Sequence, residues 1–121
     1  MADHELRMYI LLNTSVKMKP GKAIAQAGHG ISEMTEYLVK RNDPVWREYR
    51  QNSYPKIALK CPEDLLLNLH SKYKDRSQSV WCLNVEDEGR TQVPKGTVTA
   101  VVFKPMRKVD VPEELETLRL Y

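Results

Sequence analysis

The feature that most constrains the fold is an alternation between two kinds of apolar segment. Residues 6–13 (LRMYILLN) form a nearly continuous apolar run, which is typical of a strand buried on both faces. In residues 22–41 the apolar side chains recur every three or four positions, which indicates an amphipathic helix. Further along, the same reading predicts a strand at 56–60, a helix opening at 62–64, and strands at 79–85 and 97–103.

This order predicts a layered α/β structure. The connections that contain helices allow parallel strands, whereas the last one, residues 86–96, is too short for a helix and predicts an antiparallel pair. We therefore expect one domain over residues 1–121, with a four-stranded mixed sheet and helices on both faces, a three-layer α/β/α arrangement. A short helix is expected at 45–51 and a helical turn within 111–118.

The long helix at 22–41 carries two features with structural consequences. Its apolar face is predicted to contain Ile24, Ala27, Ile31, Met34 and Leu38. Its two internal glycines, at positions 28 and 30, each cost a helix about 1 kcal/mol relative to alanine. Such a cost predicts that a backbone or a ligand approaches the helix closely at these positions.

Composition narrows the class of protein. A chain of 121 residues, 41% hydrophobic and 29% charged, is large enough for a single core, and its net charge of +3 alone does not indicate nucleic-acid binding. Cys61 and Cys82 lack metal-ligand spacing, so buried free thiols in a reducing compartment are expected. No apolar run approaches membrane-spanning length, and the first residues lack the apolar stretch of a secretory signal. A cytoplasmic protein without a membrane partner is expected.

The first candidate site is the loop between the first strand and the long helix. Lys17, Lys19 and Lys22 stand where a strand's carboxyl end meets a helix N-terminus, the usual ligand crevice of an open α/β sheet. Lysines and backbone N–H groups there suit an anion. A solvated basic loop is the alternative. His29, further along the helix, is either a structural residue or a member of the site.

The second candidate site is the segment DEGRTQVPKG, residues 87–96, between the last two strands. If the first and third strands run in the same direction, both loops emerge at one edge of the sheet, and Asp87 can then face Lys22. Both residues are expected near solvent. The alternative is a simple turn that leaves Arg90 exposed.

These two segments and the C-terminus give the chain a specific resemblance. It is similar to the archaeal and eukaryotic type of peptidyl-tRNA hydrolase, a family distinct from the bacterial type. The family motif D-[LI]-K-M-G-K-G-K-x-A-A-Q-x-x-H resembles SVKMKPGKAIAQAGH here, and D-A-G-R-T-Q resembles DEGRTQ. The family's frequent Lys-Leu-Tyr ending resembles Arg-Leu-Tyr here, and the resemblance extends over about residues 6–121.

The resemblance implies a homodimer that hydrolyses the ester joining a peptide to the 3′-terminal ribose of tRNA, without metal or organic cofactor. It places the family's functional residues on Lys22, Asp87, Thr91, Thr99 and His29. Chemically, Asp87 suits orientation or deprotonation of a water, and Lys22 suits stabilisation of an oxyanion. The residues expected to hold tRNA or the bound ester are Lys17, Lys19, Arg90, Gln92 and Lys95, besides the two threonines.

The chain also departs from the family pattern. Ser15 replaces the acid before the lysine loop, Lys19-Pro20 replaces Gly-Lys, and Glu88 replaces alanine beside Asp87. These changes affect loop geometry and substrate range more than the reaction type. Two other classes stay open from the sequence: an RNA-binding module without turnover, and a protein-interaction adaptor.

Overall fold

The computed structural model describes residues 4–89 and 93–121. Its centre is a four-stranded sheet in the order β2-β1-β4-β3, which confirms the predicted mixed sheet. β1 pairs in parallel with β2, and β4 pairs antiparallel with both β1 and β3. The strands are β1 (Met8–Asn13), β2 (Lys56–Cys61), β3 (Cys82–Glu86) and β4 (Val98–Phe103).

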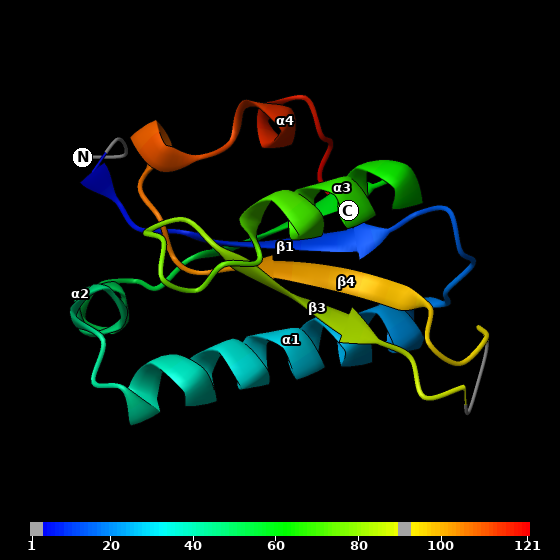
Figure 1. Ribbon diagram of the computed structural model, residues 1–121, viewed down its shortest axis with the longest axis horizontal. Helices are drawn as coiled ribbons and strands as arrows, with labels where there is room; N and C mark the ends of the chain where they lie inside the picture. Colours follow the sequence, from blue (N-terminus) through cyan, green and yellow to red (C-terminus); the bar gives the residue numbers. More distant parts are fainter. Residues whose placement is uncertain (1–3, 90–92) are drawn as a thin grey trace.

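Helices cover both faces of this sheet, so the three-layer α/β/α arrangement is also confirmed. The long helix α1 lies on one face, and α3 and α4 lie on the other (Figure 1). The short helix α2 lies beyond the end of α1 (Figure 1). The helices are α1 (Pro20–Lys40), α2 (Pro44–Gln51), α3 (Glu63–Tyr73) and α4 (Glu113–Glu116), with a 3-10 turn η2 (Lys108–Asp110) before α4.

The alternation of side chains along the central strand builds two cores. In β1, Met8 and Ile10 belong to the apolar cluster that includes α1, whereas Tyr9 and Leu11 belong to the cluster that includes α3. All six residues of β1 are buried, as a strand covered on both faces requires.

The buried face of α1 differs from the predicted one in its first half. Met34 and Leu38 are buried as expected, but Ile24 is 72% exposed. The described structure instead buries Ala23, Gln26 and Gly30 at this end. Close packing explains the glycine at position 30, because a Cβ atom there would lie only 2.4 Å from Cγ2 of Val102 in β4. A side chain at this one position would collide with the sheet.

Gly28 does not share that constraint. It is exposed, and a Cβ atom built on it would meet no atom of the described structure within 4 Å. The expected close approach is therefore confirmed for Gly30, while the structure shows no neighbour that requires glycine at position 28.

The strand directions bring the two candidate loops to one edge of the sheet. Because β1 and β3 are both antiparallel to β4, they run in the same direction, and β2 runs with them. The three strands therefore end at the edge where α1 begins (Figure 1). Within the described residues, no helix has the length and apolar character needed to cross a membrane.

Candidate active site

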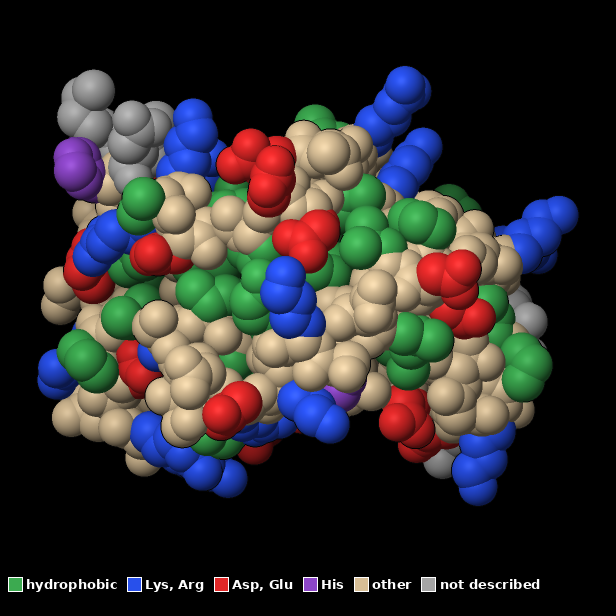
Figure 2. Space-filling model, turned by 45° about the horizontal axis from the view of Figure 1, so that its top comes forward, with side chains coloured by type: hydrophobic (Ala, Val, Ile, Leu, Met, Phe, Trp, Pro, Cys, Tyr) green, Lys and Arg blue, Asp and Glu red, His purple; other side chains and the backbone are tan. Residues whose placement is uncertain are grey.

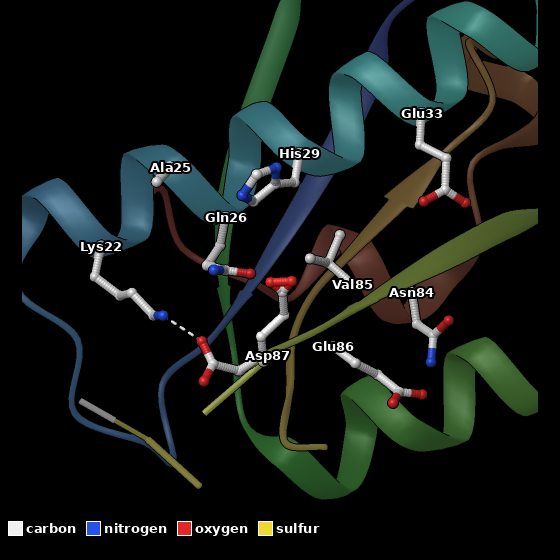
Figure 3. Close-up of a pocket in the computed structure, with 10 residues that line it drawn as sticks. Lys22, Ala25, Gln26, His29, Glu33, Asn84, Val85, Glu86 and Asp87 are labelled. Atoms are coloured by element: carbon white, nitrogen blue, oxygen red, sulfur yellow. Dashed lines mark hydrogen bonds and ion pairs between the residues drawn. The ribbon is translucent and has the colours of Figure 1, made fainter. Parts of the chain in front are cut away.

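A cavity of about 690 Å³ opens between the first half of α1 and the end of β3. Helix α1 contributes Lys22, Gln26 and His29 at successive turns, and β3 with the following residues contributes the opposite wall (Figure 3). Spacings of four and three residues place these three side chains on one side of the helix. The cavity is thus formed by the two segments that the sequence singled out.

Lys22 and Asp87 form an ion pair at this cavity, in which the Lys22 ammonium donates to Oδ1 of Asp87 (Figure 3). The side chain of Lys22 is 11% exposed and that of Asp87 is 1% exposed. The predicted meeting of the two residues is confirmed, but the expectation that both lie near solvent is wrong for Asp87. Its side chain turns inward from the strand end, where Lys22 covers it.

Backbone contacts hold Asp87 in place on three sides. Its N–H donates to the carbonyl oxygen of Thr97 at 2.8 Å, and its own carbonyl accepts from Gly96 N at 2.8 Å. Its Oδ2 accepts from the N–H of Gly89 at 2.6 Å. Gly89 has a φ of +79°, in the left-handed region that favours glycine, so this residue type allows the turn to close on the carboxylate.

These contacts decide the charge of Asp87. The hydrogen bond from Lys22 holds the pKa of the carboxyl below its ordinary value; burial opposes the shift, and the Gly89 N–H supports it. Asp87 is therefore a carboxylate at neutral pH. A carboxylate with a lowered pKa is a weak general base but a strong partner for an ammonium group.

Thr99 is fully buried and acts on the cavity through Gln26. Its hydroxyl lies 2.7 Å from Oε1 of Gln26, to which it donates. A β-bulge explains this contact: Val85 pairs with Ala100 and Glu86 with Val98, so Thr99 is an extra residue whose side chain can turn toward α1. In Figure 3 the amide nitrogen of Gln26 lies on the Lys22 side of the side chain.

The remainder of the cavity is acidic. Glu33 from α1, Glu86 from β3 and Glu88 after it line the wall together with Asp87. His29 is exposed and lines the same cavity, and within the described structure its imidazole has no hydrogen-bond partner. The structure thus places His29 in the same cavity as Lys22 and Asp87 rather than in the core.

The other predicted residues lie apart from this cavity or outside the described chain. Lys17 is exposed and lines a different hollow, on the β2 side of the sheet. Lys19 occupies the N-cap position of α1, and Lys95 packs over Gly89 in the loop before β4. Arg90, Thr91 and Gln92 lie outside the described residues.

Sequence reasoning missed Gln26 as a member of the site. It is buried, yet it lines the cavity one helical turn after Lys22. A polar residue four positions from a candidate lysine was the available signal. Among the described residues, no group of three or more His, Cys, Asp and Glu side chains is arranged to hold a metal ion.

Fold and site together define a small α/β protein with a polar pocket at the carboxyl edge of its sheet, where open α/β enzymes bind their substrates. The chain belongs to the family described as peptidyl-tRNA hydrolase PTH2, whose model matches residues 6–121.

Curated relatives support this assignment. The chain is 30% identical over 108 residues to a peptidyl-tRNA hydrolase of Methanocaldococcus jannaschii, covering 87% of this chain and 92% of that protein. It is 30% identical over 118 residues to the mouse protein named peptidyl-tRNA hydrolase 2, mitochondrial, and 28% identical to a probable peptidyl-tRNA hydrolase 2 of Drosophila melanogaster. These matches cover 97% and 98% of this chain but only 64% and 63% of the two animal proteins.

Proposed function

We propose that this chain hydrolyses the ester bond of peptidyl-tRNA, releasing the peptide and free tRNA, and that Lys22 and Asp87 form its reactive centre. Family membership supports the reaction. The observation that supports the centre is the ion pair itself, which lies at the cavity formed by both family motifs.

In the proposed mechanism Lys22 stabilises the oxyanion. An ammonium group has three donors, and the bond to Asp87 uses one of them. The others remain for the carbonyl oxygen of the ester as negative charge develops on it. Asp87, ionised, buried and fixed by Gly89, holds the ammonium in position.

Gln26 completes the polar wall of the site. Because its Oε1 accepts from Thr99, its amide N–H groups are available to the substrate carbonyl. Thr99 is then a positioning residue, since it is buried and acts through Gln26. Water adds to the carbonyl carbon, the bond to the ribose oxygen breaks, and a water proton passes to that oxygen. His29 lies on the same wall and could assist that transfer.

The tRNA is proposed to be held through its phosphates by Lys17, Lys19, Arg90 and Lys95, with Thr91 and Gln92 positioning the ester. Support comes from the resemblance and, for Lys17, Lys19 and Lys95, from their place in or next to the loops at the carboxyl edge of the sheet.

Incubation of the purified chain with peptidyl-tRNA tests the proposed function. We expect release of free peptide and intact tRNA, and the same release in excess chelator, because the mechanism assigns no step to a metal. Binding without release would instead identify an RNA-binding module, and neither binding nor release would favour an adaptor. Loss of turnover in chelator, restored by one divalent ion while the tRNA stays folded, would refute metal independence.

A homodimer and a cytoplasmic location are also proposed. The homodimer rests on the resemblance alone and predicts a particle of twice the 14.0 kDa chain in sedimentation equilibrium. The cytoplasmic location is supported by two buried free cysteines, which suit a reducing compartment. The mouse relative carries the name mitochondrial, so imaging of the tagged chain against a mitochondrial marker is the test.

A further inference from the structure

A second hollow lies at the same edge of the sheet, on the β2 side. It has a volume of about 550 Å³, and its lining includes Asn13, Lys17, Lys60 and Arg119. The segment that carries Arg119 is fixed beside β2, because Lys60 N donates to the Arg119 carbonyl oxygen at 2.8 Å and Tyr121 N donates to that of Ala58 at 2.9 Å.

Among the described side chains that line this hollow, the charged ones are all basic. Its described lining contains Lys17, Lys60 and Arg119 and no Asp or Glu. All three side chains are exposed, and within residues 4–89 and 93–121 none of them has an ion-pair partner. Figure 2 shows extended basic side chains projecting at the right-hand end of the molecule, the end toward which β1 and β3 point in Figure 1. The hollow is thus suited to an anion.

The floor of the hollow is rigid and is linked to the active site. Asn13 is 1% exposed, and its amide donates to Glu63 Oε1 at 3.0 Å and to the Val98 carbonyl oxygen at 2.9 Å. Val98 begins β4, directly after Thr97, which accepts the backbone N–H of Asp87. One polar side chain therefore joins the hollow to the strand end beside the reactive pair.

The two cavities carry opposite charge. Glu33, Glu86 and Glu88 line the active-site cavity. Glu33 is paired with Arg76 at 3.8 Å, whereas the exposed carboxylate of Glu86 would repel nucleic-acid phosphates. A substrate with a polyanionic part and a peptide part is therefore oriented by the protein. The basic hollow on the β2 side would attract its phosphates, in addition to the proposed contacts of Arg90 and Lys95, and the cavity between α1 and β3 would receive its peptide.

We infer that this hollow binds phosphates near the 3′ end of the tRNA, with Lys60 and Arg119 as binding residues besides Lys17. The inference rests on the proposed function. β2 and β3 are three strand spacings of about 4.8 Å apart, or about 14 Å, which is the length of about four stacked nucleotides at roughly 3.4 Å each. The contacted phosphates thus lie a few nucleotides from the ester.

Kinetics on substrates of increasing length test this inference. The variants are Lys60→Gln, Arg119→Gln and the double variant, and the matched control is Lys40→Gln/Arg47→Gln at the opposite end of the molecule. Lys40 and Arg47 are exposed and lie in α1's last turn and in α2. The substrates are a peptidyl-adenosine ester, which lacks phosphate, a peptidyl acceptor-stem minihelix, and full peptidyl-tRNA.

On the minihelix and on full peptidyl-tRNA, the double variant should lower kcat/KM about tenfold or more, mainly by raising KM. Each single variant should reduce the slope of log affinity against log salt concentration by about 1. On the adenosine ester the double variant should have the same kcat/KM as the wild type. Equal effects of the hollow and control variants on tRNA would overturn the inference, as would an equal loss on the adenosine ester. Failure of the wild type to cleave any substrate would contradict the proposed function instead, and filter binding of deacylated tRNA by the same variants would then decide the inference.

Discussion

The two glycines of α1 provide a matched test of how closely this helix packs on the sheet. Replacing either glycine by alanine improves helix propensity by about 1 kcal/mol. At position 30 the new Cβ would lie 2.4 Å from Val102 Cγ2 and 3.1 Å from Val85 Cγ2. Both valines are buried and β-branched, so relief requires a shift of the helix or the strand. Overpacking of this kind costs about 1–3 kcal/mol.

At position 28 the added methyl group meets no described atom, so only the propensity gain applies. Gly28→Ala should therefore raise the free energy of unfolding by about 1 kcal/mol, and Gly30→Ala should change it by about 0 to −2 kcal/mol. Because the propensity term is common to both, the difference of about 1–3 kcal/mol between the variants measures the packing term alone.

Urea unfolding followed by circular dichroism measures the free energy of unfolding of both variants. The midpoint urea concentration should move, while the m value, the slope of this free energy against urea concentration, should stay the same. Gly30→Ala should also lower turnover, because a displaced α1 moves Lys22 relative to Asp87. If Gly30→Ala were as stable as Gly28→Ala, the close approach of α1 to β4 would be refuted.

Three further outcomes are expected. Thr99→Val keeps the shape of the side chain but leaves Oε1 of Gln26 without its hydrogen-bond donor. The variant should lower the free energy of unfolding by about 1–3 kcal/mol, which urea unfolding measures. In steady-state kinetics it should lower kcat more than it changes KM. The folded-state pKa of Asp87 is lowered, so the ion pair stabilises the protein above the ordinary pKa of an aspartate and is lost as the pH falls through the folded-state value. The difference in free energy of unfolding between wild type and Asp87→Asn should therefore shrink as the pH is lowered from about 5. A difference that stayed constant over this range would contradict the pairing. Burial raises the pKa of Cys61 to about 11 and that of Cys82 to about 12, so both thiols should resist iodoacetamide in the native protein at pH 8 and react once it is unfolded in urea.

The sequence predicted the fold well because its signals are local. The buried strand at β1 and the turn residues before β4 required no tertiary knowledge, and strand direction followed from the length of each connection. The same directional argument predicted that Lys22 and Asp87 meet.

What the sequence missed depends on packing between distant segments. Ile24 fitted the helical period but is exposed, because at this end of α1 the face toward the sheet is formed by Ala23, Gln26 and Gly30. The bulge at Thr99 has no clear local signal, and without it the contact between Thr99 and Gln26 could not be foreseen. The basic hollow was missed because Lys60 and Arg119 are far apart in sequence and meet only through the pairing of the C-terminal segment with β2.

The proposed reactive pair, Lys22 and Asp87, is tested most directly by single and double substitution with peptidyl-tRNA as substrate. Asp87→Asn and Lys22→Met should each lower kcat by about 10²-fold or more, and thermal melts should show that each variant still folds. The double variant should lose far less than the product of the two single losses, because the two groups act as a unit. Glu88→Ala, the neighbouring exposed carboxylate, should retain most of the turnover. Near-normal turnover in Asp87→Asn together with its loss in Glu88→Ala would contradict the assignment of the reactive centre.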